Sequence, residues 1–453
     1  MNEPKLQSRW HTSRKFLTDL LDLSALEERQ LRRLVQAQLA SFSGDLLVFA
    51  AMPAAVTAIG GSASLLGTVL GAQALSLAFF FVVGGVVGDR FNRRTVAVCA
   101  DVMCFASQLA MALLFILGDA TFWQLLVAQV IQGAGLALSL TALNGLIPEA
   151  VASWRLQEAN ALLAVARAVG AFTGPLVAGG ILALGLGPGW AFVADSLTFL
   201  ASAQCLGRIK LRWRGRGDSH SLASDLRAGW REFWSKSWIW AVVMEFALLN
   251  AAAIAPFFVI GPTLPEELLP GPGGWPVILA AMGLGEILGG LVAKVWRPDR
   301  PLLAAVLAAA AWGLPLALVT LLAPAAVVAI GVAIGGAGLV LFEALWMTTL
   351  QSQVSSGFRS RVASFDFLGS RGLVFLGYVL GGVAADSVGP QLALLGSLVV
   401  LAVATCLVAS LRSIRTLTVD IETQCESNDD LAGADQSRAS AAGRAAVLHG
   451  AGL

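Results

Sequence analysis

Apolar runs of helix-spanning length recur along this 453-residue chain and limit its fold more than any other feature. A run of about twenty residues, built as a helix, crosses the roughly 30 Å hydrocarbon core of a bilayer. The predicted spans are residues 37–59, 65–87, 95–117, 122–143, 161–184, 188–206, 238–260, 274–296, 301–322, 325–350, 364–385 and 390–411. Charged residues make up only 13% of the chain, too few to cover a water-soluble fold of this size. The sequence therefore predicts an all-α integral membrane protein with twelve transmembrane helices.

Outside the spans, the basic residues are confined to one side of the predicted membrane. No Arg or Lys occurs in the loops 60–64, 118–121, 185–189, 261–273, 323–324 and 386–389. The alternate loops and the terminal segments hold the basic residues instead, which is the pattern of the cytoplasmic side of a membrane protein. We therefore predict a multi-pass protein of the cell inner, or cytoplasmic, membrane, with both termini in the cytoplasm.

The spans and loops divide the chain into five parts. These are a cytoplasmic N-terminal segment (1–36), an N-terminal six-helix bundle (37–206), a cytoplasmic connector (207–237), a C-terminal six-helix bundle (238–411) and a disordered cytoplasmic tail (412–453). The halves resemble each other at an offset of 204–205 residues, which places Arg167 on Arg371 and Asp45 on Asn250. Parallel repeats of six helices predict two bundles that rock about a site near the membrane midplane.

Several functional classes lack the residues they need. The three histidines, His11, His220 and His449, lie in polar segments and form no metal-ligand cluster. No lysine follows a glycine, as a phosphate-binding loop requires. Thirty basic residues against twenty-nine acidic ones give no electrostatic footprint for nucleic acid. We expect no metal, no cofactor, no nucleic-acid partner and no enzymatic activity, and an ion gradient as the energy source.

A charged motif ends the second predicted span. It reads Gly84-Gly85-Val86-Val87-Gly88-Asp89-Arg90-Phe91-Asn92-Arg93-Arg94. It resembles the G-x-x-x-D-R-x-x-R-R loop of the major facilitator superfamily, which implies that superfamily's two-bundle fold. Through this resemblance, the predicted gating residues are Gly85, Asp89, Arg90, Arg93 and Arg94.

The gating motif has a mechanical interpretation. Asp89 can face the N-terminal end of the eleventh helix, where unpaired N–H groups favour an anion. The arginines would then pair with acids or lipid phosphates and hold the two bundles together on the cytoplasmic side. A topology anchor explains the arginines equally well, but it does not explain Asp89.

A second motif points to export. Gly170-x-x-x-Gly174-Pro175, followed by Gly179-Gly180, resembles the fifth-helix motif of proton-driven exporters in the superfamily. The glycine pair stands one residue late, with Ala178 at the first glycine position, and Gln129 stands where the fourth-helix arginine of that group is expected.

Four further fragments narrow the resemblance. They are Ser43-Gly44-Asp45, Ile147-Pro148-Glu149, Leu156-x-x-Ala159-Asn160 and Arg361-Val362-Ala363-Ser364. They are similar to the twelve-span drug/metabolite:proton antiporters that include macrolide efflux and enterobactin exporter proteins. The likeness implies a secondary active transporter that exports drugs or secondary metabolites by proton antiport.

Charges inside the membrane each need a role, because insertion costs at least about 2.5–3.5 kcal/mol per charge. The resemblance makes the first, seventh and tenth helices line a cavity, and they carry Asp45, Glu245 and Glu343, our candidates for proton or substrate coupling. The strongest is Asp45, because the five residues after it are apolar and burial among such residues disfavours a charged carboxyl. A structural pair between Asp45 and an arginine such as Arg167 is the alternative.

Four other intramembrane charges are predicted to be structural. They are Asp101, Arg167, Glu286 and Arg371, which we expect to bond within the bundles, while Asp195 lies toward the outer side of its span. The expected partners are the lipid bilayer, an amphipathic small-molecule substrate and the proton gradient, with a monomer as the working unit. A siderophore exporter, a proton-coupled nutrient importer and a non-transporting sensor remain alternatives.

Overall fold

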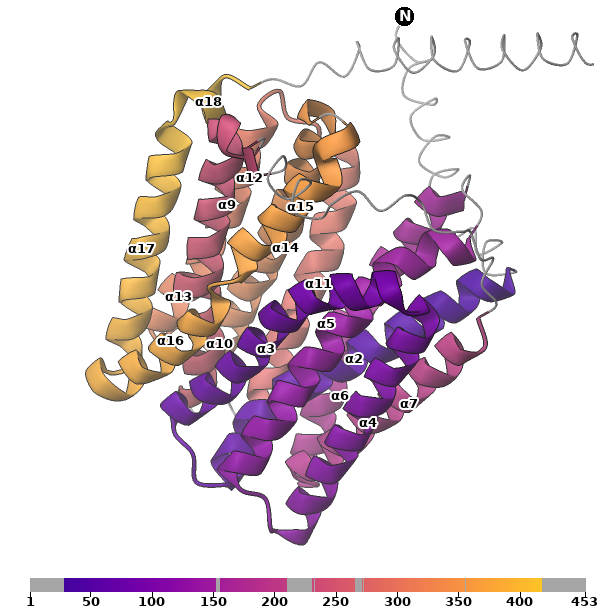
Figure 1. The fold of residues 1–453 in the computed structure, drawn as a ribbon. Helices are drawn as coiled ribbons and strands as arrows, with labels where there is room; N and C mark the ends of the chain where they lie inside the picture. The colour runs from indigo at the N-terminus through magenta and orange to yellow at the C-terminus, as the bar shows by residue number, and fades with distance from the viewer. Residues whose placement is uncertain are drawn as a thin grey trace, which may run out of the picture.

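In the computed structural model the chain folds into two groups of helices that meet at one end and diverge toward the other (Figure 1). The structure describes residues 28–151, 155–209, 230–231, 233–264, 271, 273–354 and 356–417, and these form helices and no strand. The predicted segment before residue 28, most of the connector and the tail after residue 417 lie outside the described residues.

Six helices form the first group. They are α2 (Arg29–Ala58), α3 (Ala63–Arg90), α4 (Arg93–Leu117), α5 (Phe122–Ala150), α6 (Leu156–Ala183) and α7 (Pro188–Gly207). Within this group α2 packs against α6 and α7, while α4 packs against α5 and α7, and α3 against α5. We call it the N-bundle.

In the second group, the C-bundle, several helices are interrupted. It contains α9 (Ser237–Leu249), η3 (Asn250–Ile254), α10 (Ala255–Ile260), η4 (Gly261–Thr263), α11 (Gly274–Val295), α12 (Pro301–Ala310), α13 (Gly313–Thr320), α14 (Ala325–Gln353), α15 (Ser356–Arg371), α16 (Val374–Val388), α17 (Pro390–Ser410) and the short α18 (Arg412–Arg415). Here α14 packs against α11 and α12, and α17 packs against α13.

The interruptions have local causes. Pro256 lacks an N–H and its ring excludes the carbonyl four residues earlier, and the π-helical turn η3 ends just before it. Pro315 follows the break between α12 and α13 in the same way. Gly372 separates α15 from α16, and its N–H bonds the Leu368 carbonyl at 2.8 Å.

Eleven helical segments of the described chain are long and apolar enough to cross a membrane. The helix α7 occupies the sixth position but is not among them, because Asp195, Ser196, Ser202 and Gln204 lower its hydropathy. The first helix begins at Arg29, eight residues before the predicted span, since Leu31 and Leu34 are buried at the end of the N-bundle. Its start within the predicted N-terminal segment is thus a correction of that boundary.

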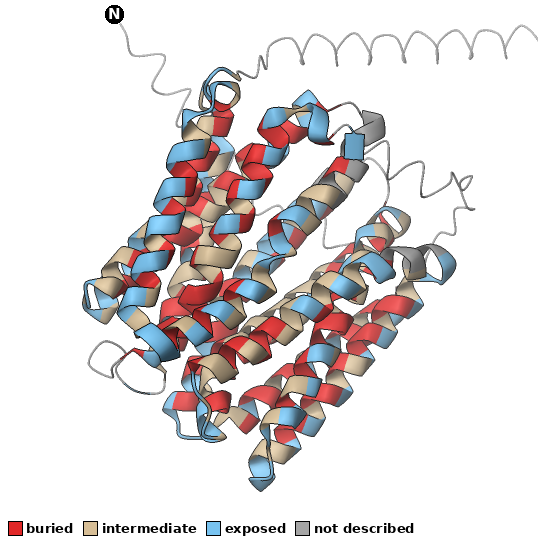
Figure 2. Cartoon of the chain, turned by 60° about the vertical axis from the view of Figure 1, so that its left-hand side comes forward, coloured by how far each residue is buried: buried red, intermediate tan, exposed pale blue. Residues whose placement is uncertain are grey.

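The surface suits lipid contact. Along each helix, buried and exposed residues alternate, so that one face packs and the other is open (Figure 2). The open faces carry large apolar side chains, with Trp123 and Val295 each 71% exposed. In water such a surface would be a liability, whereas in a bilayer it is the ordinary lipid-facing surface.

The two bundles meet chiefly at one end, which we call the outer end after the topology that the sequence predicts. There α3 packs against α16, and α6 against α11. Glycines allow these close approaches, because a Cβ at Gly67 would strike the Tyr378 carbonyl and one at Gly283 would strike the backbone of Ala171. A further ring contact, Phe81 on Phe367 with centroids 4.1 Å apart, joins α3 to α15 farther from this end.

Candidate functional site

Asp45 lies on α2, half-buried within the N-bundle. The Gln132 amide of α5 donates a hydrogen bond to Asp45 Oδ1 at 2.8 Å. Arg167 is exposed, and the structure gives no ion pair between it and Asp45 in the described residues. The alternative of an Asp45–Arg167 pair therefore finds no support, and an uncharged side chain is what contacts the carboxylate.

Two more carboxylates approach Asp45. Asp101 of α4 is buried and accepts hydrogen bonds from Ser202 Oγ at 2.6 Å and Ser139 Oγ at 3.5 Å. Asp195 of α7 is also buried, and the Thr198 hydroxyl donates to its Oδ1 at 3.3 Å. The two lie close enough to Asp45 for their charges to interact with it. The serine bonds of Asp101 agree with the bundle-packing role predicted for it.

Asp195 is not among the residues predicted to couple proton and substrate. It is the single acid of the sixth predicted span, and the sequence does not show which neighbour it faces. The isolated polar group Asp195-Ser196-x-Thr198 in an otherwise apolar run was the available signal.

Glu245 of α9 is buried at 2% exposure, and neither of its carboxylate oxygens has a hydrogen-bond partner among the described residues. The polar residue that interacts with Glu245 is Thr405 of α17. Its hydroxyl also has no hydrogen-bond partner among the described residues. Glu245 therefore faces α17, a neighbouring helix of its own bundle. Its position in the sequence is well separated from those of the other acids.

A second acidic group lies in the C-bundle. Glu286 of α11 is half-buried and Glu343 of α14 is exposed, and the two are close enough to interact. Asp366 of α15, which the sequence did not single out, accepts a hydrogen bond from Trp346 Nε1 at 3.0 Å and also interacts with Glu343. Arg371 is exposed, with its guanidinium carbon 5.3 Å from the centroid of the Phe367 ring.

The predicted gating motif covers the C-terminal end of α3 and the start of α4. Arg93 pairs with Glu149 at 3.3 Å, and Arg94 donates to the Ile209 carbonyl at 3.1 Å, both within the N-bundle. Arg90 is exposed at the last turn of α3. The Asp89 side chain and the surroundings of Gly85 are not described, so the contact of Asp89 with the eleventh helix stays a prediction.

The predicted antiporter motif lies along α6. Gly170 and Gly174 face α2, where a Cβ at either position would press on the backbone of Ser43. Gly179 packs against the C-bundle, beside Pro276 of α11. Pro175 stands inside the helix between these two contacts. The motif therefore brings α6 against α2 with one part and against the C-bundle with the other.

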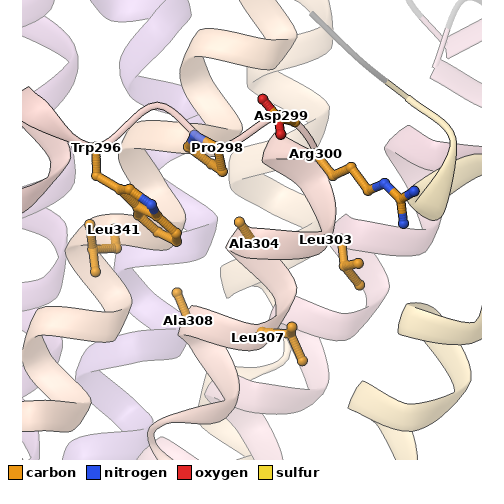
Figure 3. Close-up of a pocket in the computed structure, with 9 residues that line it drawn as sticks. All are labelled: Trp296, Pro298, Asp299, Arg300, Leu303, Ala304, Leu307, Ala308 and Leu341. Carbon is orange, nitrogen blue, oxygen red and sulfur yellow. The ribbon is translucent and has the colours of Figure 1, made fainter.

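Two surface hollows lie away from these acids. One of about 680 Å³ lies beside α12 and is lined by Trp296, Pro298, Asp299, Arg300, Leu303, Ala304, Leu307, Ala308 and Leu341. Its apolar side chains gather around the indole, while the Arg300 side chain extends away from them (Figure 3). Another of about 430 Å³ lies between the bundles at the outer end, where Ser62 and Asp386 are among its lining residues. None of Asp45, Glu245 and Glu343 lines either hollow.

Comparison with known families agrees with this architecture. The family profile of the Major Facilitator Superfamily matches residues 34–375. The chain belongs to the major facilitator superfamily. It is thus a multi-pass membrane protein in a family of transporters, with the two-bundle fold that the loop motif implied.

Relatives and solved structures fall in the same superfamily. The chain is 24% identical to the multidrug efflux pump Tap of Mycolicibacterium fortuitum over 371 residues, 78% of this chain and 88% of that protein. It is 26% identical to the enterobactin exporter EntS of Shigella dysenteriae over 222 residues, 49% of this chain and only 52%, about half, of EntS.

Among solved structures, a bacterial homologue of the iron transporter ferroportin in an inward-facing state matches with a TM-score of 0.68. That match has 16% identity and covers 84% of this chain and 99% of the other. A bacterial homologue of the lysosomal transporter Spinster matches with a TM-score of 0.64 and 15% identity, over 85% and 96% of the two chains. At these identities the likeness supports the fold alone.

Proposed function

We propose that this protein is a secondary active exporter of amphipathic drugs or secondary metabolites, and that it exchanges them for protons. The observation that carries the proposal is the acidic character of its membrane interior. Carboxylates stand on α2, α4, α7, α9, α11, α14 and α15 at Asp45, Asp101, Asp195, Glu245, Glu286, Glu343 and Asp366. The cations of the spans, Arg167 and Arg371, are both exposed. Such an interior favours protons and cationic or neutral amphiphiles over anions.

The proton and the substrate would compete for the same negative charge. In this scheme Asp45 takes a proton while the carrier is empty and releases it when substrate is exchanged, with Glu245 and Glu343 as the other candidate coupling residues. Gln132 can stabilise either form of Asp45, because an amide both donates and accepts hydrogen bonds. The substrate undergoes no chemical change, so no enzymatic step is involved.

The arrangement of the bundles suits loading from the cytoplasm. The close packing of α3 on α16 and of α6 on α11 lies at the outer end, so we interpret the structure as inward-open, with both termini cytoplasmic in the inner membrane. The division into two bundles about a cytoplasmic connector, and a monomeric working unit, are part of the same proposal. Reporter fusions at residues 118–121 and 207–237 test it: external readings at the first and internal at the second are expected, and the reverse overturns this orientation.

Siderophore export is the second candidate, because several matched relatives are enterobactin exporters. We rank this candidate below drug export, because the match covers 88% of the efflux pump Tap but only 52% of EntS. Growth under iron starvation distinguishes the two, since a siderophore exporter lost by deletion leaves its siderophore inside the cell.

The decisive experiment is transport by the purified full chain in liposomes. With an imposed pH gradient and ethidium as the probe, we expect accumulation that a protonophore abolishes. Deletion and overexpression strains scored against cationic antibiotics and dyes extend the probe set. If no dye moves and no strain changes its resistance, the export proposal is wrong. If dye moves without regard to the pH gradient, export stands and proton coupling is wrong.

A further inference from the structure

The carboxylates of the N-bundle gather around one point. Asp45, Asp101 and Asp195 come from three helices, and the buried Cys104 thiol of α4 interacts with all three. The three carboxylates could together carry three negative charges inside a low-dielectric bundle. Like charges this close do not all ionise without a compensating cation.

The helix backbone permits the closest of these contacts at Gly44. A Cβ there would overlap the Thr198 hydroxyl and Asp195 Oδ1, so both side chains lie directly on α2. Gly44 precedes Asp45 in the chain. The absence of a side chain at this one position therefore brings the carboxylate of α7 next to that of α2.

The groups that face the cluster include no buried cation. Against α2 pack α6, which contributes the exposed Arg167, and α7, which contributes Asp195. From α4 come Asp101 and Cys104, while α5 contributes the uncharged Gln132. Among the described residues, nothing on these helices neutralises the carboxylates except a proton or a bound cation.

Unfilled hydrogen-bonding capacity points to the proton. Gln132 is 2% exposed, its amide nitrogen bonds Asp45, and its Oε1 has no partner among the described residues. Asp195 Oδ2 is fully buried and also lacks a partner. A buried acceptor with no donor is energetically unfavourable, because it has lost its bonds to water. A proton on a carboxyl turns one such acceptor into a donor.

Solvation differs among the three acids. Both oxygens of Asp101 accept from serine hydroxyls, so its charged form is supported by the protein. Asp195 receives one long bond on Oδ1 and none on Oδ2. Where neighbouring carboxyls differ in this way, the better solvated one stays ionised and the other holds the proton.

We propose that Asp45 and Asp195 form a proton-binding pair across Gly44, and that both are protonated in this state while Asp101 remains ionised. Each carboxyl binds one proton as COOH and releases it to leave the carboxylate, and no other bond changes. This deepens the proposed function, and rests on it only for the use of the pair in transport. Asp195 becomes a second proton-carrying residue beside Asp45, across Gly44.

Infrared spectroscopy of the purified full chain in lipid tests proton occupancy without any substrate. The carbonyl stretch of protonated carboxyl groups is compared between wild type and the variants Asp45→Asn, Asp101→Asn and Asp195→Asn, over neutral to alkaline pH. The exposed Asp119 supplies the control variant Asp119→Asn. We expect the neutral-pH band to lose one carboxyl's intensity in Asp45→Asn and in Asp195→Asn, and none in Asp119→Asn. In Asp101→Asn the band should keep its neutral-pH intensity but disappear at a lower alkaline pH than in wild type, because the substitution removes a negative neighbour that opposes ionisation of Asp45. A whole carboxyl's intensity lost there at neutral pH, with the rest of the titration unshifted, means that Asp101 held the proton.

An unchanged neutral-pH band in Asp195→Asn overturns the proposal, as does a band lost only in Asp101→Asn. If Asp195→Asn fails to reach the membrane, Thr198→Val replaces it, because removal of the hydroxyl bond to Oδ1 shifts the stretch of a protonated Asp195 and leaves an ionised one without any band to shift. The liposome assay stays independent of this result. If the carboxyl bands are present but transport is not proton-driven, only the proposed function is contradicted. If transport is proton-driven but the Asp195 band is absent, only this inference is contradicted.

Discussion

The surroundings of Asp45 allow its carboxyl group to be either charged or protonated. Its described side-chain bond comes from the Gln132 amide at 2.8 Å, not from a cation. A permanent ion pair would hold the carboxylate ionised, whereas an amide tolerates both protonation states. In the proposed exchange, Asp45 would pass between proton and substrate without breaking a salt bridge.

The first prediction follows from that exchange. Asp45→Asn keeps the side-chain size and the contact with Gln132 but carries no exchangeable proton. We expect accumulation of dye in liposomes to fall to the level seen without a pH gradient, while dye binding to the purified protein stays measurable. Glu343→Gln serves as the comparison on α14. Proton-driven accumulation that survives Asp45→Asn and disappears in Glu343→Gln would place the coupling site in the C-bundle.

Gly44 supports the second prediction at the same scale. An alanine there overlaps Thr198 Oγ1 and Asp195 Oδ1, so α7 must move away from α2. Overpacking of this kind typically costs about 1–3 kcal/mol of unfolding free energy. The thermal midpoint in detergent should therefore fall. Gly396→Ala on α17 is the matched control, because open space surrounds its Cβ position and its midpoint should hold or rise slightly. Equal midpoints for the two variants would mean that α2 and α7 are not held this close.

At the scale of elements, the N-terminus of α3 is capped from the other bundle. Asp386 Oδ2 of α16 accepts from Ser62 Oγ at 2.8 Å and from the Ser64 backbone N–H at 3.0 Å. The unpaired N–H groups and positive end of a helix favour a carboxylate at this position. A state open at the outer end must break both bonds, so Asp386 holds the bundles together there.

The third prediction concerns this cap. Asp386→Ala removes both bonds, and a partly exposed cap of this kind is worth about 1 kcal/mol, or roughly a fivefold change in the ratio of states. Spin labels on Asp119→Cys and Leu321→Cys, at exposed outer positions of the two bundles, report their separation once the native Cys99, Cys205, Cys406 and Cys425 are replaced by serine. We expect a new population at longer distance. Asp299→Asn, at the opposite end, should leave the distribution as it is, and no change in Asp386→Ala would show that the cap does not bias the outer end.

Length and hydropathy were enough to place the helices, because each span must cross the same thickness of hydrocarbon. The breaks at η3 and Gly372 escaped prediction, since a proline or glycine in an apolar run is tolerated in membrane helices with or without a break. The prediction of a two-bundle fold came from the resemblance of the loop motif to that of the major facilitator superfamily. Asp45 and Asp101 were visible as charges in apolar runs, but their convergence with Asp195 depends on helix rotation and packing, which no linear pattern contains.

At the scale of the whole molecule, the two halves resemble each other in sequence but carry different side chains at one matching position. Asn250 stands at the position matching Asp45, and its amide donates to the Phe246 carbonyl at 2.8 Å and the Ser370 carbonyl at 3.4 Å. The N-bundle thus holds a titratable group where the C-bundle holds only a hydrogen-bonding one. In alternating access, one bundle would bind and release the proton while the other supplies the opposing wall for substrate.

The last prediction joins the two bundles at the cytoplasmic end. Closing that end should bring the last turn of α3 toward α15 and α16, and Asp89 stands at that turn. Asp89→Asn keeps its size but removes the anion that we expect to meet the N-terminal end of α15, which begins the eleventh helix. We expect normal protein levels, loss of dye efflux, and spin labels on Gly207→Cys and Asp299→Cys that stay far apart when wild type approaches closure. Both label sites are exposed, and a Cβ at Gly207 meets open space. Efflux at the wild-type rate would reduce the charged loop to a marker of topology, whereas lost efflux with normal closure would assign Asp89 a role in substrate movement instead.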